Sequence, residues 1–212
     1  MNRATRTIVS TLGALLGFAG MDHGFCEALQ GNTPTGGLLI NAIRAGSPWT
    51  RWTQGGEGAF TLVPNFLVTG LLAMFIGLVI VIWSIRFVHR PHGPLVLLLL
   101  FVALFLVGGG VGQILFFSLV CAVATRIHHP LNGWRTALPS NVRRGLAQVW
   151  LGALVAGVCL FLFALEIAIF GYVPGMTDLN LILYTNWAVL AVGLGVLLLT
   201  FVAGFAHDIE SA

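Results

Sequence analysis

The side chains that could do chemistry in this sequence are the few polar ones that lie inside, or at the ends of, long apolar runs. His23 and Glu27 lie four residues apart near the end of the first run, and Glu166 lies inside a later one. An ionisable side chain inside a bilayer is costly, so it usually marks a pathway, a proton relay or a paired contact. We therefore expect these three residues to belong to a functional site.

The spacing of His23 and Glu27 is compatible with three kinds of site, because residues four apart share one face of a helix. The two could ligate a metal ion, relay a proton, or form a hydrogen-bonded pair that only holds helices together. Helical di-metal sites use Glu-x-x-His with further carboxylates, whereas here the order and the spacing differ. With Glu166 as the further carboxylate, these residues are metal candidates, although a structural pair is favoured. The identity of any cofactor stays open.

Composition predicts the class of protein in which this chemistry would occur. Hydrophobic residues make up 58% of the chain and charged residues 8%, against about 25% charged in an average soluble domain. All ten basic residues are arginines, and most flank apolar runs instead of forming one surface. That pattern indicates membrane orientation and argues against nucleic acid as a partner. No Ser-His-Asp arrangement or G-x-S-x-G motif supports an enzyme with a nucleophilic residue.

Four apolar runs are each long enough to cross a hydrocarbon core of about 30 Å. They are residues 7–30, 62–88, 148–171 and 181–205. The first run also resembles a signal peptide, but its cleavage site is weak, and we favour a retained helix that ends before Gly31. Residues 31–60 predict an outer loop, with an apolar patch at 38–43 and with Trp49 and Trp52 at the membrane interface.

Residues 95–125 form an apolar segment that glycines interrupt at positions 108, 109, 110 and 112. One interpretation is a single long kinked helix, and the other is a re-entrant or short helical hairpin that turns at the glycines. With the hairpin, eight of the ten arginines lie on one side of the membrane, as the positive-inside tendency requires. We therefore favour the hairpin, with both termini and a loop at 126–147 in the cytoplasm. Gly108, Gly109, Gly110 and Gly112 are then candidate hinge or gate residues.

This orientation brings polar residues from separate segments to a similar depth in the outer part of the membrane. The proposed pocket for a small solute or ion comprises His23, Glu27, Asn65, Gln113, Glu166 and Asn186. Gly13, Gly17, Gly20 and Gly24 form a smooth stripe on the first helix, which permits close helix approach. Glu27 lies near this stripe and should face protein instead of lipid.

The sequence thus predicts an all-α fold with a single integral membrane domain over residues 1–212. It is a polytopic helical bundle of four transmembrane helices plus the Gly-broken hairpin, in the cell membrane. A small permease-like or channel-like protein is the leading hypothesis. The alternatives are a non-catalytic subunit that docks a membrane partner or a second copy, and an intramembrane metalloenzyme. The arginine-rich loop at 126–144 should meet anionic lipid headgroups.

Overall fold

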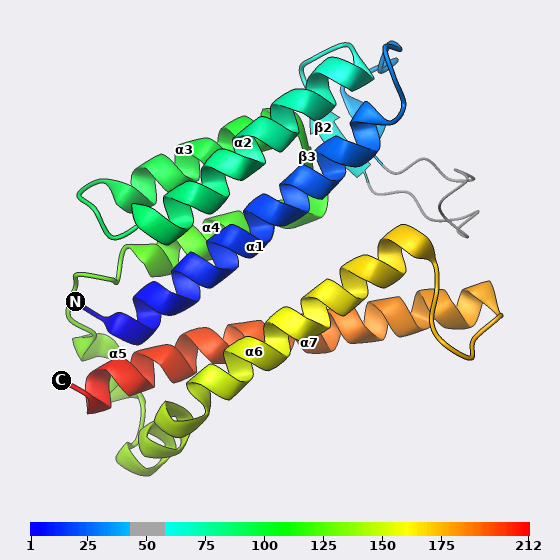
Figure 1. Cartoon of the computed structure of the whole chain (residues 1–212). Helices are drawn as coiled ribbons and strands as arrows, with labels where there is room; N and C mark the ends of the chain where they lie inside the picture. Colours follow the sequence, from blue (N-terminus) through cyan, green and yellow to red (C-terminus); the bar gives the residue numbers. More distant parts are fainter. Residues whose placement is uncertain (43–57) are drawn as a thin grey trace. The chain divides into compact units, whose positions relative to one another are not determined.

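The computed structural model describes residues 1–42 and 58–212, and Trp49 and Trp52 lie outside the described residues. Four helices are long and apolar enough to cross a membrane, by length and composition. They are α1 (Arg3–Ala28), α2 (Phe66–Arg86), α6 (Ser140–Phe170) and α7 (Leu179–Glu210), as Figure 1 shows. The predicted helical membrane class with four candidate spans is confirmed.

The helices differ from the predicted spans at their ends. α6 begins at Ser140 and α7 continues to Glu210, in both cases beyond the predicted limits. Hydropathy marks only the apolar part of a helix, whereas backbone hydrogen bonding continues into the polar turns at its ends. α2 begins later than predicted because the Asn65 side chain accepts a hydrogen bond from the backbone N–H of Val68 and so caps the helix.

Residues 93–124 fold back on themselves, as the hairpin hypothesis predicted. The segment contains α3 (Gly93–Leu106), β3 (Val107–Gly110), the 3-10 helix η1 (Val111–Gln113) and α4 (Ile114–Ala124). The rings of Phe101 in α3 and Phe117 in α4 stack with their centroids 4.2 Å apart. The two arms therefore pack against each other, and a single kinked helix is excluded. A short helix, α5 (Asn132–Ala137), precedes α6.

A small antiparallel sheet joins the glycine segment to the loop after α1. Its strand order is β1 (Leu39–Asn41), β2 (Gly58–Thr61) and β3, with Ala59 opposite Gly110 and Thr61 opposite Val107. We predicted a loop with an interfacial patch here and no strands. Strands of three or four residues are too short to show the alternation of apolar and polar residues that identifies a strand in sequence.

The chain divides into two compact units. Within the described residues, unit 1 contains residues 1–8 and 126–212, and unit 2 contains residues 9–42 and 58–125. Helix α1 begins in unit 1 and continues through unit 2. Unit 1 thus holds both termini with α5, α6 and α7, whereas unit 2 holds the sheet and the broken hairpin (Figure 1).

In unit 1, the C-terminal helix caps the first turn of α1. The buried Asp208 carboxylate accepts hydrogen bonds from the backbone N–H groups of Ala4 and Thr5, at 2.9 and 2.8 Å, and from the Thr5 hydroxyl at 2.6 Å. These N–H groups have no partner within the helix, and a negative charge at this end also complements the helix dipole. Asp208 therefore fixes the start of α1 against α7.

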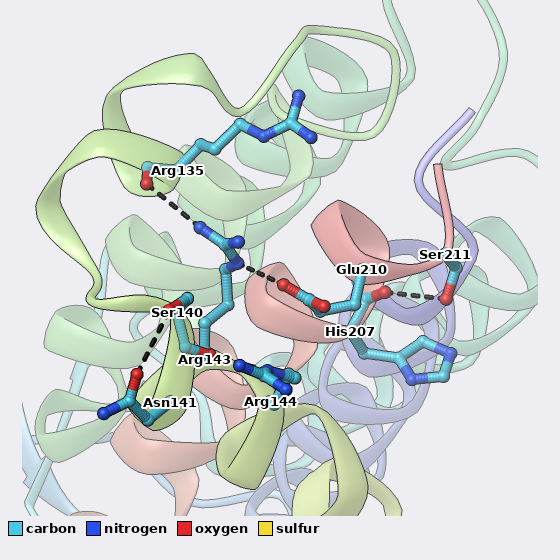
Figure 2. A network of polar contacts seen from close by, with 8 residues as sticks. All are labelled: Arg135, Ser140, Asn141, Arg143, Arg144, His207, Glu210 and Ser211. Carbon is cyan, nitrogen blue, oxygen red and sulfur yellow. Dashed lines mark hydrogen bonds and ion pairs between the residues drawn. The ribbon is translucent and has the colours of Figure 1, made fainter.

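Asp208→Ala is expected to lower the free energy of unfolding by about 2 kcal/mol, because it leaves two helix N–H groups unpaired. Glu210→Ala is the matched control, two residues along the same helix. Glu210 forms a partly exposed ion pair with Arg143 (Figure 2), and such pairs contribute less than about 1 kcal/mol. Thermal unfolding followed by circular dichroism in detergent measures both. Equal losses in the two variants would contradict the capping role.

In unit 2, the predicted glycine stripe of α1 packs against α2. A Cβ atom added at Gly17 would lie 2.8 Å from the carbonyl oxygen of Gly77, and one added at Gly24 would lie 2.6 Å from that of Gly70. The two backbones are therefore as close as glycine allows, which is how small residues hold membrane helices together. Gly17 and Gly24 of the stripe therefore make their close helix contacts within this chain.

Gly24→Val is expected to destabilise the protein by about 2 kcal/mol or more, because α1 and α2 must separate to admit the side chain. Gly152→Val in α6 is the control, since a Cβ atom at Gly152 meets no atom within 4 Å. Both substitutions carry the same helix-propensity change, so their difference in unfolding temperature isolates the packing contribution. If both variants unfold at the same temperature, the close α1–α2 contact does not stabilise unit 2.

Candidate functional site

The candidate site in unit 2 is built on the last turns of α1. His23 is 2% exposed and Glu27 is 0% exposed, which confirms that this face of α1 points into protein. The two side chains lie one helical turn apart on the same face. An acid and an imidazole are therefore enclosed on the same face of α1.

The glycine strand β3 covers these two side chains. A Cβ atom added at Gly110 would lie 2.7 Å from Cε1 and 2.8 Å from Nε2 of His23, and one added at Gly108 would lie 2.5 Å from Oε1 of Glu27. Gly108 also has a φ of 109°, which side chains other than glycine rarely adopt. The glycines thus allow the backbone of β3 to lie directly against His23 and Glu27.

Glu27 is the most unusual group in the site. Both carboxylate oxygens are buried, and neither has a hydrogen-bond partner among the described residues. A buried charge costs several kcal/mol or more unless it is paired or hydrogen-bonded. No hydrogen bond within the described residues offsets this cost for Glu27. Glu27 is therefore the first candidate in unit 2 for a functional role.

Gln113 is the third predicted site residue that unit 2 buries. It lies in η1, directly after the glycine strand, and is 8% exposed. Its side-chain oxygen Oε1 is buried without a hydrogen-bond partner in the described part of the chain. The segment that covers His23 and Glu27 therefore carries a buried amide of its own, three residues beyond Gly110.

Asn65 has a structural role in unit 2. Besides capping α2, its side-chain amide donates a hydrogen bond to Oδ1 of Asn32 at 2.7 Å. These contacts use both ends of the amide and tie the start of α2 to the loop after α1. Asn65 therefore helps to position the site, and its inclusion among the pocket-lining residues stays a prediction.

Two threonines that the sequence analysis did not single out hold β3 in place. The Thr69 hydroxyl donates to the carbonyl oxygen of Val107 at 2.7 Å, and the Thr61 and Thr69 hydroxyls are 2.6 Å apart. Since Thr69 donates its proton to Val107, Thr61 is the donor to Thr69. The signal that could have found them is Thr69 itself, a hydroxyl one turn after Asn65 in an otherwise apolar helix.

Glu166 and Asn186 belong to unit 1. The contacts of Gly157 with Leu197 and of Gly193 with Leu160 set an antiparallel register of α6 and α7. In this register Glu166 and Asn186 lie at about the same level, both half-buried. Oδ1 of Asn186 has no hydrogen-bond partner among the described residues. The other four predicted residues belong to unit 2, so one pocket shared by all six stays a prediction.

The metal hypothesis gains no support from the geometry. Within residues 1–42 and 58–212, no three His, Cys, Asp or Glu side chains come together as a group that could hold a metal ion. Asp22, an acid that the sequence analysis left out, lies next to His23 in α1 and is half-buried. Its position on the helix differs from that of Glu27 by five residues, so the two acids point in different directions.

By length and composition, then, this is a helical membrane protein with four candidate spans, and the most enclosed polar site in unit 2 lies between α1 and a glycine strand. Comparison with protein-family models, with curated proteins and with solved structures finds no match. The chemistry of the site is therefore the basis on which a function can be proposed.

Proposed function

We propose that this chain is a small permease-like or channel-like membrane protein in which Glu27 binds the transported proton or small cation. The observation that supports this is the Glu27 carboxylate, fully buried and with neither oxygen hydrogen-bonded within the described structure. Acidic residues with such surroundings in membrane segments belong by default to ion pathways and proton relays. His23, one turn away, is the group that would pass a proton to or from Glu27.

Strand β3 is the proposed gate of this pathway. Gly108 and Gly110 lie directly against Glu27 and His23, so an ion reaches the carboxylate only when this segment moves away from α1. Transporters commonly place such broken segments beside the ion site, where backbone groups can replace the water of hydration. Gly109 and Gly112 complete the proposed hinge, and Gln113 would line the opened path.

In the proposed orientation, both termini lie in the cytoplasm. The end of unit 2 that carries the sheet lies at the outer side of the membrane. Arg86 at the end of α2 and Arg90 just beyond it would then lie on the cytoplasmic side of the membrane, as would Arg3, Arg6, Arg126, Arg135, Arg143 and Arg144. In this orientation the pocket around Glu27 opens outward.

Cysteine accessibility tests the orientation. Single cysteines placed at position 90 and at position 135 of a variant without native cysteines are expected to react from the same side of the membrane, that of the cytoplasm. A membrane-impermeant maleimide applied to intact cells should label neither, and should label both after the cells are opened. Labelling of one position in intact cells would contradict the orientation.

The two alternative functions have less support. A glycine stripe could have docked a partner subunit, but here it packs against α2 of the same chain. A metalloenzyme would need at least three ligands together, and no such group occurs in the described residues. Neither alternative accounts for a fully buried acid whose oxygens have no hydrogen-bond partner among the described residues.

Ion flux into liposomes tests the proposed function. The purified full chain would be reconstituted into liposomes that contain a dye sensitive to H⁺, Na⁺ or K⁺, and a gradient of the matching ion would be imposed on each preparation. We expect flux of at least one of these ions at a rate well above that of protein-free liposomes. No flux under any gradient, from protein that retains its helical circular dichroism, would overturn the proposal in favour of a non-transporting subunit.

A further inference from the structure

We propose that the end of unit 1 that carries both termini holds the phosphate of one anionic phospholipid headgroup, in a pocket formed by Arg126 and Trp134. The pocket measures about 280 Å³ and is lined by residues from the loop after α4 and from α5. The lining residues are Arg126, Pro130, Leu131, Gly133, Trp134 and Ala137. This binding site is independent of the ion site around Glu27.

The charge at this end of unit 1 is strongly positive. Among the residues that the structure describes, six arginines belong to it, whereas the two acids in the last turns of α7 are already engaged. Asp208 caps α1. Glu210 pairs with Arg143, as Figure 2 shows. Basic clusters of this size beside a membrane span attract anionic lipid. The arginines are Arg3, Arg6, Arg126, Arg135, Arg143 and Arg144.

The guanidinium of Arg126 is available to a ligand. Arg126 is exposed, and its guanidinium makes no hydrogen bond or ion pair with any residue that the structure describes. Its backbone, in contrast, is held firmly. The Asn2 side chain donates to the carbonyl oxygens of Arg126 and His129, at 2.6 and 3.0 Å. A fixed backbone with a free guanidinium suits recognition of a phosphate, which arginine can bind with two parallel hydrogen bonds.

Trp134 places the pocket at the level of the membrane interface. Its ring lies 5.2 Å, between centroids, from the ring of Phe205 in the last turns of α7, and the Trp134 residue is still 37% exposed. Tryptophan prefers the headgroup level, where one part of the ring contacts apolar groups and the indole N–H contacts polar ones. An ion pair from Arg126 and contact with Trp134 together fit a phospholipid headgroup better than a soluble anion.

Lipid titration tests this site in the purified full chain. Phosphatidylglycerol, added to the protein in neutral detergent, is expected to raise its unfolding temperature, whereas phosphatidylcholine has little effect. Arg126→Gln should weaken the apparent phosphatidylglycerol affinity about fivefold, and Trp134→Ala should also weaken it. Arg90→Gln is the control, because Arg90 is equally exposed but lies in unit 2.

Three outcomes would overturn the proposal. One is equal stabilisation by phosphatidylcholine, and another is an equal loss of affinity in Arg126→Gln and Arg90→Gln. The third is stabilisation by glycerol 3-phosphate at the concentrations at which the lipid acts, which would assign the pocket to a soluble phosphate compound. Native mass spectrometry provides an independent readout, since the wild-type protein should retain a phosphatidylglycerol molecule that Arg126→Gln loses. This test does not depend on ion flux.

Discussion

Glu27→Gln is expected to reduce ion flux through the reconstituted protein by about ten- to a hundredfold while leaving its stability unchanged or higher. Glutamine has nearly the same size and shape but cannot carry a negative charge or release a proton. A polar interaction with a charged group contributes about 1.5–3 kcal/mol, and about 1.4 kcal/mol corresponds to a factor of ten. The neutral amide is also less costly to bury than a carboxylate that lacks a partner.

The opposite signs of these two effects separate a functional role from a structural one. If Glu27 held the fold together, its replacement would lower the unfolding temperature, and any loss of flux would follow from misfolding. Flux in liposomes and unfolding by circular dichroism should therefore be measured on the same preparations. Glu166→Gln serves as the comparison. Full flux in Glu27→Gln together with loss in Glu166→Gln would place the ion site in unit 1 and contradict our assignment.

Gly110→Ala is expected to destabilise unit 2 by about 1–3 kcal/mol, because its new methyl group overlaps the His23 ring. Gly110 has a φ of −59°, which alanine adopts without strain. The cost therefore comes from the His23 contact alone. In a His23→Ala background, Gly110→Ala should cost little stability, because the ring that the methyl group would overlap is absent. The two substitutions should therefore show a large coupling free energy.

Two neighbouring glycines act as controls for this double-mutant cycle. Gly112→Ala should change stability by less than about 0.5 kcal/mol, since a Cβ atom there meets no atom within 4 Å. Gly108→Ala should be destabilising, and removal of the Glu27 side chain should not restore stability, because the φ of 109° remains strained for alanine. Independent effects of the His23 and Gly110 substitutions would show that β3 does not rest on α1 as described.

The helical class could be predicted because hydrophobicity acts over whole segments. About 20 apolar residues have few other structures available to them in a membrane. The fold-back of residues 93–124 could be predicted from the distribution of arginines. The burial of Glu27 followed from the glycine stripe on its helix, since close helix approach at Gly17 and Gly24 turns the adjacent face inward.

The arrangement of the site could not be predicted, because it depends on contacts between segments far apart in sequence. Nothing in the run of glycines from 108 to 112 indicates that it pairs with β2 and covers His23. The sequence suggested a flexible turn, whereas Thr69 and the sheet fix the segment. Similarly, Asn65 was grouped with the pocket residues by depth, but depth alone does not reveal that its amide is used to cap α2.

The central claim is that Glu27 is the ion-binding group of a transport pathway. Its most direct test is to follow flux in wild-type proteoliposomes while dicyclohexylcarbodiimide, an apolar reagent for buried carboxylic acids, modifies the protein. Mass spectrometry would locate and quantify the adduct at each time point. We predict that flux falls in proportion to the fraction of Glu27 that is modified, and that Glu27→Gln protein acquires no adduct at position 27. Undiminished flux from protein fully modified at Glu27 would contradict the claim.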